Sequence, residues 1–197
     1  MYRPKDLKAW ENTPVSVSTG EVEKLPPGGY VCEIKDVVVR PSSKGNEMMC
    51  LSLEVKQGEF AGIFAKNFER KKNFDPHAKW PCIYYQLTGL DEAHPDERSQ
   101  SRFKGVLTAI EDSNAGYKWN WDEKSLIGKT VGVVFREEEY DYMGHTGTST
   151  KPYYLRRADG VEEAKIPKMR TLDTSTAAPS QGVQNQTSVT ADDDLPF

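Results

Sequence analysis

The sequence has no long hydrophobic run and few cysteines. No stretch of its 197 residues approaches the roughly 18 consecutive apolar residues of a membrane-spanning helix, and the first residues lack the apolar segment of a signal peptide. We therefore expect a cytoplasmic protein that does not interact with membranes. Three isolated cysteines, Cys32, Cys50 and Cys82, match neither a disulfide framework nor a CxxC metal site. All three fall in predicted strands, where a buried thiol is the usual explanation.

The motifs of common enzyme classes are also missing. The sequence contains no phosphate-binding loop, Rossmann glycine fingerprint, nucleophile elbow or HExxH helix. Its three histidines, His77, His94 and His145, lie in three separate predicted loops and so indicate no metal site. The acids of residues 137–141 could bind Mg²⁺ in a nuclease, but consecutive strand residues alternate between faces. We expect no enzyme, no cofactor and no metal, and a nuclease remains the third alternative.

Positive charge is absent from the C-terminal end of the chain. Residues 173–197 contain no Lys or Arg, and they carry four of the 30 acidic residues. Residues 1–172 therefore hold 26 acids and 26 bases, so the net charge of −4 belongs to the end of the chain. Residues 173–191 are mostly small and polar. This composition predicts a disordered linker, because it offers too little apolar surface to offset the entropy of ordering.

The chain ends on a tip that is both acidic and apolar, Asp-Asp-Asp-Leu-Pro-Phe at residues 192–197. A terminal aromatic ring on a solvated linker gains nothing in the free chain, but it fits the apolar pocket of a partner protein. The carboxylates would steer the tip toward a basic rim, and the proline limits the conformations lost on binding. We predict that the partner-binding residues are Asp192, Asp193, Asp194, Leu195, Pro196 and Phe197.

This tip resembles the acidic C-terminal tip of bacterial and phage single-stranded DNA-binding proteins. The resemblance covers six residues at the chain terminus, after a linker of the composition that the family uses. It implies an OB-fold that holds single-stranded DNA and a tip that docks replication, recombination and repair enzymes. The predicted helix at 103–110 and the Gly-Tyr-Lys-Trp segment at 116–119 resemble phage members of the family from Gram-positive hosts. The implied location is the cytoplasm of a bacterium or an infected cell, in association with the nucleoid.

The body of the chain predicts a mainly β fold without reference to the tip. Alternating apolar residues between turns predict five strands, at residues 30–39, 49–55, 80–87, 130–138 and 151–157. In the first strand, Tyr30, Cys32, Ile34 and Asp36 are expected to share one face. Apolar spacing predicts a helix around 103–110, with Ser99 or Ser101 as its cap.

This element order predicts an OB-fold, a five-stranded barrel with one helix between strands 3 and 4. Residues 60–79 are expected to form a long excursion with some helix. We divide the chain into an N-terminal extension at 1–25, an OB-fold domain at 26–172, a disordered linker at 173–191 and the tip at 192–197.

Sequence-independent binding of a single strand needs cations for phosphates and flat side chains for bases. Three segments interleave the two. The residues that we expect to contact DNA are, in the first segment, Lys66, Arg70, Lys71, Lys72, Lys79, Trp80 and Tyr84; in the second, Tyr117, Lys118, Trp119 and Trp121; in the third, Arg136, Tyr140, Tyr142, Lys151, Tyr153 and Arg156. Alternatively, some of these rings belong to the core, or the second segment is a flap over the barrel. The acidic run 137–139 repels phosphate and should face elsewhere.

These observations favour a protein that covers single-stranded DNA and recruits partner enzymes through its tip. The main alternative is an adaptor or decoy that does not bind DNA and uses the tip to occupy the pockets of host partner proteins. No heptad or apolar stripe decides the oligomeric state, so a homo-oligomer stays open.

Overall fold

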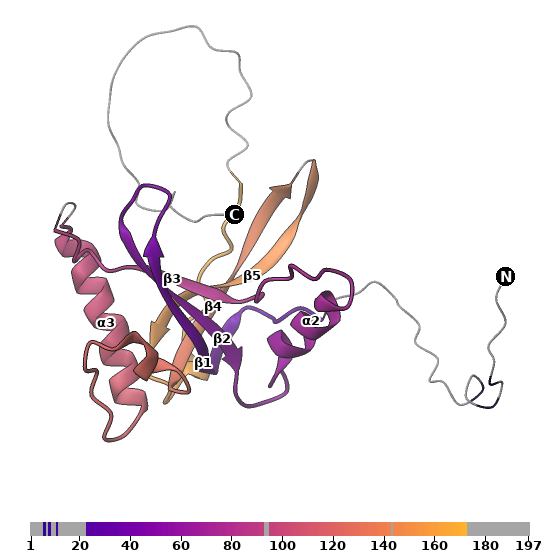
Figure 1. The fold of residues 1–197 in the computed structure, drawn as a ribbon, viewed down its shortest axis with the longest axis horizontal. Coiled ribbons are helices and arrows are strands. Elements are labelled where there is room, and N and C mark those ends of the chain that lie inside the picture. The colour runs from indigo at the N-terminus through magenta and orange to yellow at the C-terminus, as the bar shows by residue number, and fades with distance from the viewer. Residues whose placement is uncertain are drawn as a thin grey trace, which may run out of the picture.

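The computed structural model describes residues 6, 8, 11, 23–92, 95–142 and 144–172. The predicted linker and tip, at 173–191 and 192–197, lie outside the described residues. One five-stranded antiparallel sheet forms the centre, in the order β3-β2-β1-β4-β5 (Figure 1). Its strands are β1 (Gly28–Pro41), β2 (Glu47–Val55), β3 (Ile83–Leu87), β4 (Thr130–Tyr142) and β5 (His145–Arg156).

Two α-helices accompany the sheet. Helix α2 (Ile63–Lys72) follows β2, and α3 (Glu97–Ser113) lies between β3 and β4 along the chain. The short 3-10 helices are η1 (Glu123–Leu126) and η2 (Val161–Glu163). In Figure 1, α2 and α3 lie on opposite sides of the sheet, and the β1–β2 and β4–β5 hairpins project from the same end. No helix in the described part of the chain is long and apolar enough to cross a membrane.

The prediction of a mainly β fold is confirmed, but the predicted closure of the barrel is not. Within the described ranges no ladder joins β3 to β5, so the sheet is open between these two strands, which approach each other without pairing. β3 starts at Ile83 rather than at residue 80. Trp80 instead donates its indole N–H to the Leu53 carbonyl at 2.8 Å, and Pro81 has no N–H to add to a ladder.

The long strand β1 is shared by the two halves of the sheet. Residues 28–33 pair with β4, and residues 32–41 pair with β2. A β-bulge between Ile34 and Asp36 changes the alternation. Consequently Val37 is buried in the core, whereas Asp36 is exposed, contrary to the predicted face.

The core lies between the bent sheet and α3. Helix α3 contributes Phe103, Val106 and Ile110, which are all buried, and α2 contributes Ile63 and Phe64. The three cysteines are buried as predicted. Burial raises the pKa of each thiol, so little reactive thiolate forms near neutral pH.

The first turn of α2 is capped by a residue of a neighbouring strand. Its N-cap residue, Gly62, offers no side chain, and the buried carboxylate of Glu54 on β2 takes this role. Glu54 accepts hydrogen bonds from the backbone N–H groups of Phe64 at 3.1 Å and of Ala65, and from its neighbour Val55 at 2.9 Å. A carboxylate is favoured there because the first N–H groups of a helix have no partner within the helix. This contact fixes α2 to β2.

Helix α3 begins earlier than the sequence predicts. Its cap is Asp96, which accepts hydrogen bonds from the backbone N–H groups of Arg98 at 3.3 Å and Ser99 at 3.1 Å. The predicted caps Ser99 and Ser101 are therefore wrong, since both lie inside the helix. The Ser99 hydroxyl also donates to Asp96, and these hydrogen bonds lower the pKa of the carboxyl group.

Replacing Asp96 with alanine is expected to lower the Tm by about 2–4 °C at neutral pH, because the first turn of α3 loses its cap. Folding lowers the pKa of the Asp96 carboxyl group, so the cap contributes its full stability at any pH above the unfolded-state pKa. This contribution is lost as the pH falls through the folded-state pKa. The Tm difference should therefore vanish on acidification, while the exposed control Asp112→Ala should change little at either pH. Equal effects of the two variants in a thermal melt would contradict the capping role.

Candidate nucleic-acid interface

A groove of about 600 Å³ lies between α2 and the β4–β5 hairpin of the sheet. Both elements lie toward the right of the ribbon in Figure 1. Residues 23–25 cross beside it, with the Lys24 ammonium donating to the Thr148 carbonyl and the Asn67 side chain donating to the Glu23 carbonyl. The groove is lined by Glu23, Lys24, Leu25, Phe64, Asn67, Arg70, Lys71, Phe74, Pro81, Tyr140, Thr148, Ser149 and Thr150.

This groove combines cations with exposed rings. Arg70 and Lys71 lie in the last turn of α2, and Lys24 adds a third cation. Phe74, just after the helix, is 84% exposed, and Tyr140 of β4 is 40% exposed. Cations suit a phosphate backbone and flat rings suit unpaired bases, so the groove has the two components that single-strand binding requires.

The acidic run of β4 does not turn its charge into the groove. Glu137 and Glu139 alternate with Glu138, so they lie on the face opposite Tyr140. Glu138 lies on the same face as Tyr140, but it is buried, and its carboxylate meets the Arg136 guanidinium at 2.6 Å and the Lys151 ammonium at 3.8 Å. Glu138 is thus neutralised by cations. The Ser149 hydroxyl beside it is buried and has no hydrogen-bond partner among the described residues.

Four of the predicted aromatic contacts pack into the fold. Trp80 packs on Phe68 with 5.4 Å between ring centroids. Burial raises the pKa of Tyr84 to about 12. Tyr117 shares a hydrogen bond with the Ser125 hydroxyl at 2.8 Å, and Trp119 meets the edge of the Phe103 ring. All four rings pack against the main core, which gives each of them a structural role.

Other predicted contacts lie outside the groove lining. Trp121 is 71% exposed, has a left-handed backbone with φ of 67°, and packs on Trp119. Lys118 donates to Glu111 at 2.7 Å, and this pair raises the pKa of Lys118 and lowers that of Glu111. Lys66 is not a lining residue but lies beside the groove, because it pairs at 2.9 Å with Glu23 of the lining. Exposed side chains outside the groove lining complete the predicted set: Lys72, Lys79, Tyr142, Tyr153 and Arg156.

The structure thus brings three predicted residues together in the groove, Arg70, Lys71 and Tyr140. Arg136 and Lys151 support it indirectly by neutralising Glu138. Lys24 and Ser149 belong to the groove but were not predicted. No local signal reveals them, because Lys24 precedes the first strand and Ser149 depends on the register of the β4–β5 hairpin.

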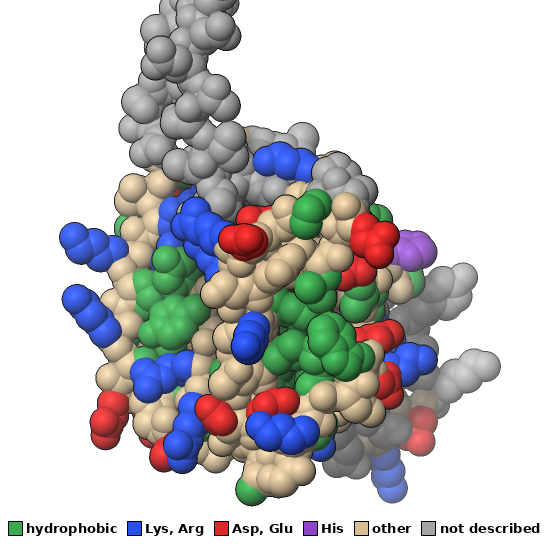
Figure 2. Space-filling view, turned by 90° about the vertical axis from the view of Figure 1, so that its left-hand side faces the viewer, with side chains coloured by type: hydrophobic (Ala, Val, Ile, Leu, Met, Phe, Trp, Pro, Cys, Tyr) green, Lys and Arg blue, Asp and Glu red, His purple; other side chains and the backbone are tan. Residues whose placement is uncertain are grey.

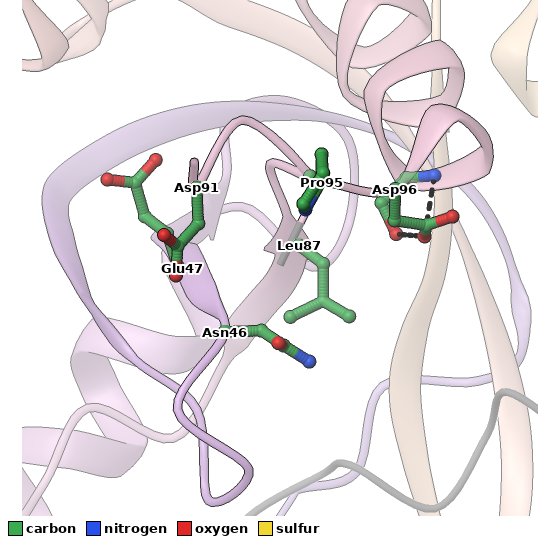
Figure 3. A pocket seen from close by; sticks show the side chains of 8 residues that line it. Asn46, Glu47, Leu87, Asp91, Pro95 and Asp96 are labelled. Carbon is green, nitrogen blue, oxygen red and sulfur yellow. Dashed lines mark hydrogen bonds between the residues drawn. The ribbon is translucent and has the colours of Figure 1, made fainter. Parts of the chain in front are cut away.

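A second, smaller cavity of about 280 Å³ lies between the β1–β2 turn and the start of α3 (Figure 3). Its carboxylates, Glu47 and Asp91 on one side and Asp96 on the other, make it unsuitable for a phosphate backbone. In the described part of the chain, no three His, Cys, Asp or Glu residues form a group that could hold a metal ion.

The face that carries α3 has a mixed surface charge (Figure 2). Hydrophobic side chains gather in two areas, with Lys and Arg around the left one and acids along much of the opposite margin. This agrees with the equal numbers of acids and bases before residue 173. The sequence of the chain matches no protein-family model and no curated protein.

Proposed function

We propose that the chain is a single-stranded DNA-binding protein whose body covers exposed strands and whose C-terminal tip recruits replication, recombination and repair proteins. The observation that carries this proposal is the groove between α2 and the β4–β5 hairpin, which holds three cations and two exposed rings. Phosphates would lie along Lys24, Arg70 and Lys71, while bases stack on Phe74 and Tyr140. Such contacts read no base edge, so binding is independent of sequence.

The sheet supports an OB-type body. An OB-fold is a partly open five-stranded barrel whose first strand belongs to both halves, and here β1 pairs with β2 and β4 through different parts of its length. The edge strands β3 and β5 approach each other where such a barrel closes. OB-folds commonly bind oligonucleotides with the loop between strands 4 and 5, and the β4–β5 hairpin forms one wall of the groove.

The last described residues of the body also suit the proposal. Arg170 pairs with the edge of β4, donating to the Glu137 carbonyl at 3.0 Å and accepting from the Glu139 N–H at 2.9 Å. The chain therefore leaves the body at the hairpin that walls the groove. With about 25 residues behind it, a flexible tail has an r.m.s. reach of about 25–30 Å, which raises the effective concentration of a recruited enzyme near bound DNA.

Titration with oligo-dT tests the DNA-binding part of the proposal. A labelled oligonucleotide is expected to gain fluorescence anisotropy and to shift in a native gel when the protein is added. A duplex of equal length should bind at least about tenfold more weakly, since its bases cannot stack on the protein. The variant Trp121→Phe should keep the affinity, because Trp121 lies outside the groove. Absence of both an anisotropy change and a gel shift would refute the proposal and favour the adaptor or decoy.

Deleting residues 195–197 tests the recruiting part. Retention of a purified host replication or repair enzyme should be lost, while the affinity for oligo-dT stays within about twofold, since the proposed DNA contacts are residues of the body. The matched control deletes three linker residues, Gln184, Asn185 and Gln186. If the control loses the enzyme equally, or if DNA binding falls with the tip, the assigned division of labour is wrong.

A further inference from the structure

Gly147 is a strand glycine that no turn requires. It lies in β5, directly opposite Tyr140 of β4. Its φ is not among the positive values that glycine adopts more easily than other residues. A glycine inside a strand weakens it, because it has no side chain to pack and loses much backbone entropy on folding. Such a position often marks the close approach of another group.

At Gly147 the group that approaches is the Tyr140 ring, which takes the place of the missing side chain. A β-carbon on Gly147 would lie 2.8 Å from the Tyr140 hydroxyl oxygen and 3.0 Å from its Cζ atom. Non-bonded carbons pack at about 3.5–4.0 Å, so no side chain fits between the two residues. Tyr140 also lines the groove and is 40% exposed. The ring therefore rests on the glycine and still presents surface to a ligand in the groove.

Other tightly enclosed glycines are surrounded by backbone instead. A β-carbon on Gly29 would collide with the Val161 carbonyl, and one on Gly132 would lie 2.6 Å from the Arg157 carbonyl oxygen. A side chain at either position would displace the backbone of the fold. At Gly147 the obstacle is the end of one side chain, so an added methyl group would move the ring and leave the strands in place.

The neighbouring pairs on this face limit where the ring can move. On one side of Tyr140 the next cross-strand pair is Glu138 with Ser149, and Glu138 is buried. On the other side the next pair is Tyr142 with His145, both exposed at the end of the hairpin. A methyl group on the glycine would thus push the ring toward the hairpin end, away from its present place on the groove wall.

We propose that Gly147 is a positioning residue, whose missing side chain holds the Tyr140 ring in the orientation that stacks on a base. This inference rests on the proposed function, because it assigns the ring to DNA. Gly147 acts through Tyr140, so it sets the part of the affinity that depends on bases. The part that depends on phosphates, at Lys24, Arg70 and Lys71, is independent of it.

The position of the ring is measured first, without DNA. A ring that lies over a glycine moves the Hα resonances of that glycine away from their ordinary strand values. NMR should find such displaced resonances for Gly147, and Tyr140→Ala should return them to ordinary values. Undisplaced resonances in the wild-type chain would overturn the inference, and this result would not bear on whether the chain binds DNA.

Two ligands then separate bases from phosphates, oligo-dT and an abasic strand of equal length. Gly147→Ala should lower the affinity for oligo-dT about fivefold, because a displaced ring loses stacking on a base. The affinity for the abasic strand should change less than about twofold, since its phosphates remain. The matched control is Gly105→Ala on α3, where a β-carbon meets no neighbour, and it should leave both affinities unchanged.

A double variant distinguishes positioning from a structural role. If the glycine acts through the ring, Gly147→Ala should change the oligo-dT affinity less than about twofold in a Tyr140→Ala background. A ring that only shields the bare strand predicts lower stability and no dependence on bases. Equal losses for oligo-dT and the abasic strand, an undiminished loss in the Tyr140→Ala background, or wild-type affinity of Gly147→Ala would each overturn the inference while the proposed function stands. A wild-type chain that binds neither strand would refute the proposed function, and the role of the ring with it.

Discussion

Replacing Arg70 and Lys71 with glutamate is expected to lower the affinity for oligo-dT about 100-fold at low salt. Each cation that contacts a phosphate contributes about 1.5 kcal/mol or more, and every 1.4 kcal/mol changes the dissociation constant tenfold. Both residues lie in the last turn of α2 and line the groove opposite Tyr140. The affinity is measured by fluorescence anisotropy of a labelled strand.

A matched control changes the net charge by the same amount elsewhere. Lys104 on α3 and Lys124 in η1 are exposed and lie outside the groove lining. Their replacement by glutamate should reduce the affinity less than about fivefold, because exposed charges beyond a Debye length are largely screened. If both double variants lose affinity equally, DNA responds only to the total charge, and the groove is not the binding site. A thermal melt of each variant confirms that the fold is intact.

Replacing Glu54 with alanine is expected to lower the free energy of unfolding by about 2–3 kcal/mol. The buried carboxylate accepts three backbone hydrogen bonds, and its removal leaves the N–H groups of Phe64 and Ala65 without a partner at the start of α2. Because α2 carries Arg70 and Lys71, the same variant should also weaken DNA binding. Urea unfolding measures the loss of stability.

Two controls separate capping from a general effect on α2. Glu69→Ala, an exposed change on the same helix, should stay within about 0.5 kcal/mol of the wild type. Glu54→Gln keeps one oxygen acceptor and should fall between the wild type and the alanine variant. A stability of Glu54→Ala equal to that of Glu69→Ala would show that Glu54 does not hold α2.

The regular elements could be predicted because their signals are local. Strand alternation and the apolar spacing of Phe103, Val106 and Ile110 indicate five strands and a helix, and the structure has them. The bulge before Asp36 could not be predicted, since an extra residue in one strand depends on its partner strand. The cap by Glu54 is equally non-local, because an acid in an alternating strand predicts only a solvent-facing side chain.

Only part of the candidate binding site could be predicted, because only part of it has a local signal in the sequence. Interleaved cations and rings indicate a binding surface, and Arg70, Lys71 and Tyr140 meet in one groove. Composition cannot tell a stacking platform from a core ring, and the structure packs Trp80 and Trp119 against the core. The number of charges does not predict where they gather, because residues 1–172, with 26 acids and 26 bases, still place three cations in one groove.

The most direct test of DNA binding in the groove is the affinity for oligo-dT at two salt concentrations. If Lys24, Arg70 and Lys71 each neutralise one phosphate, the affinity should fall about 20-fold between about 50 mM and about 200 mM salt, from a slope of about −0.7 per phosphate for single strands. The Arg70→Glu/Lys71→Glu variant should retain only a shallow dependence, about threefold or less. An affinity independent of salt, or the same slope in both proteins, would contradict binding through this groove.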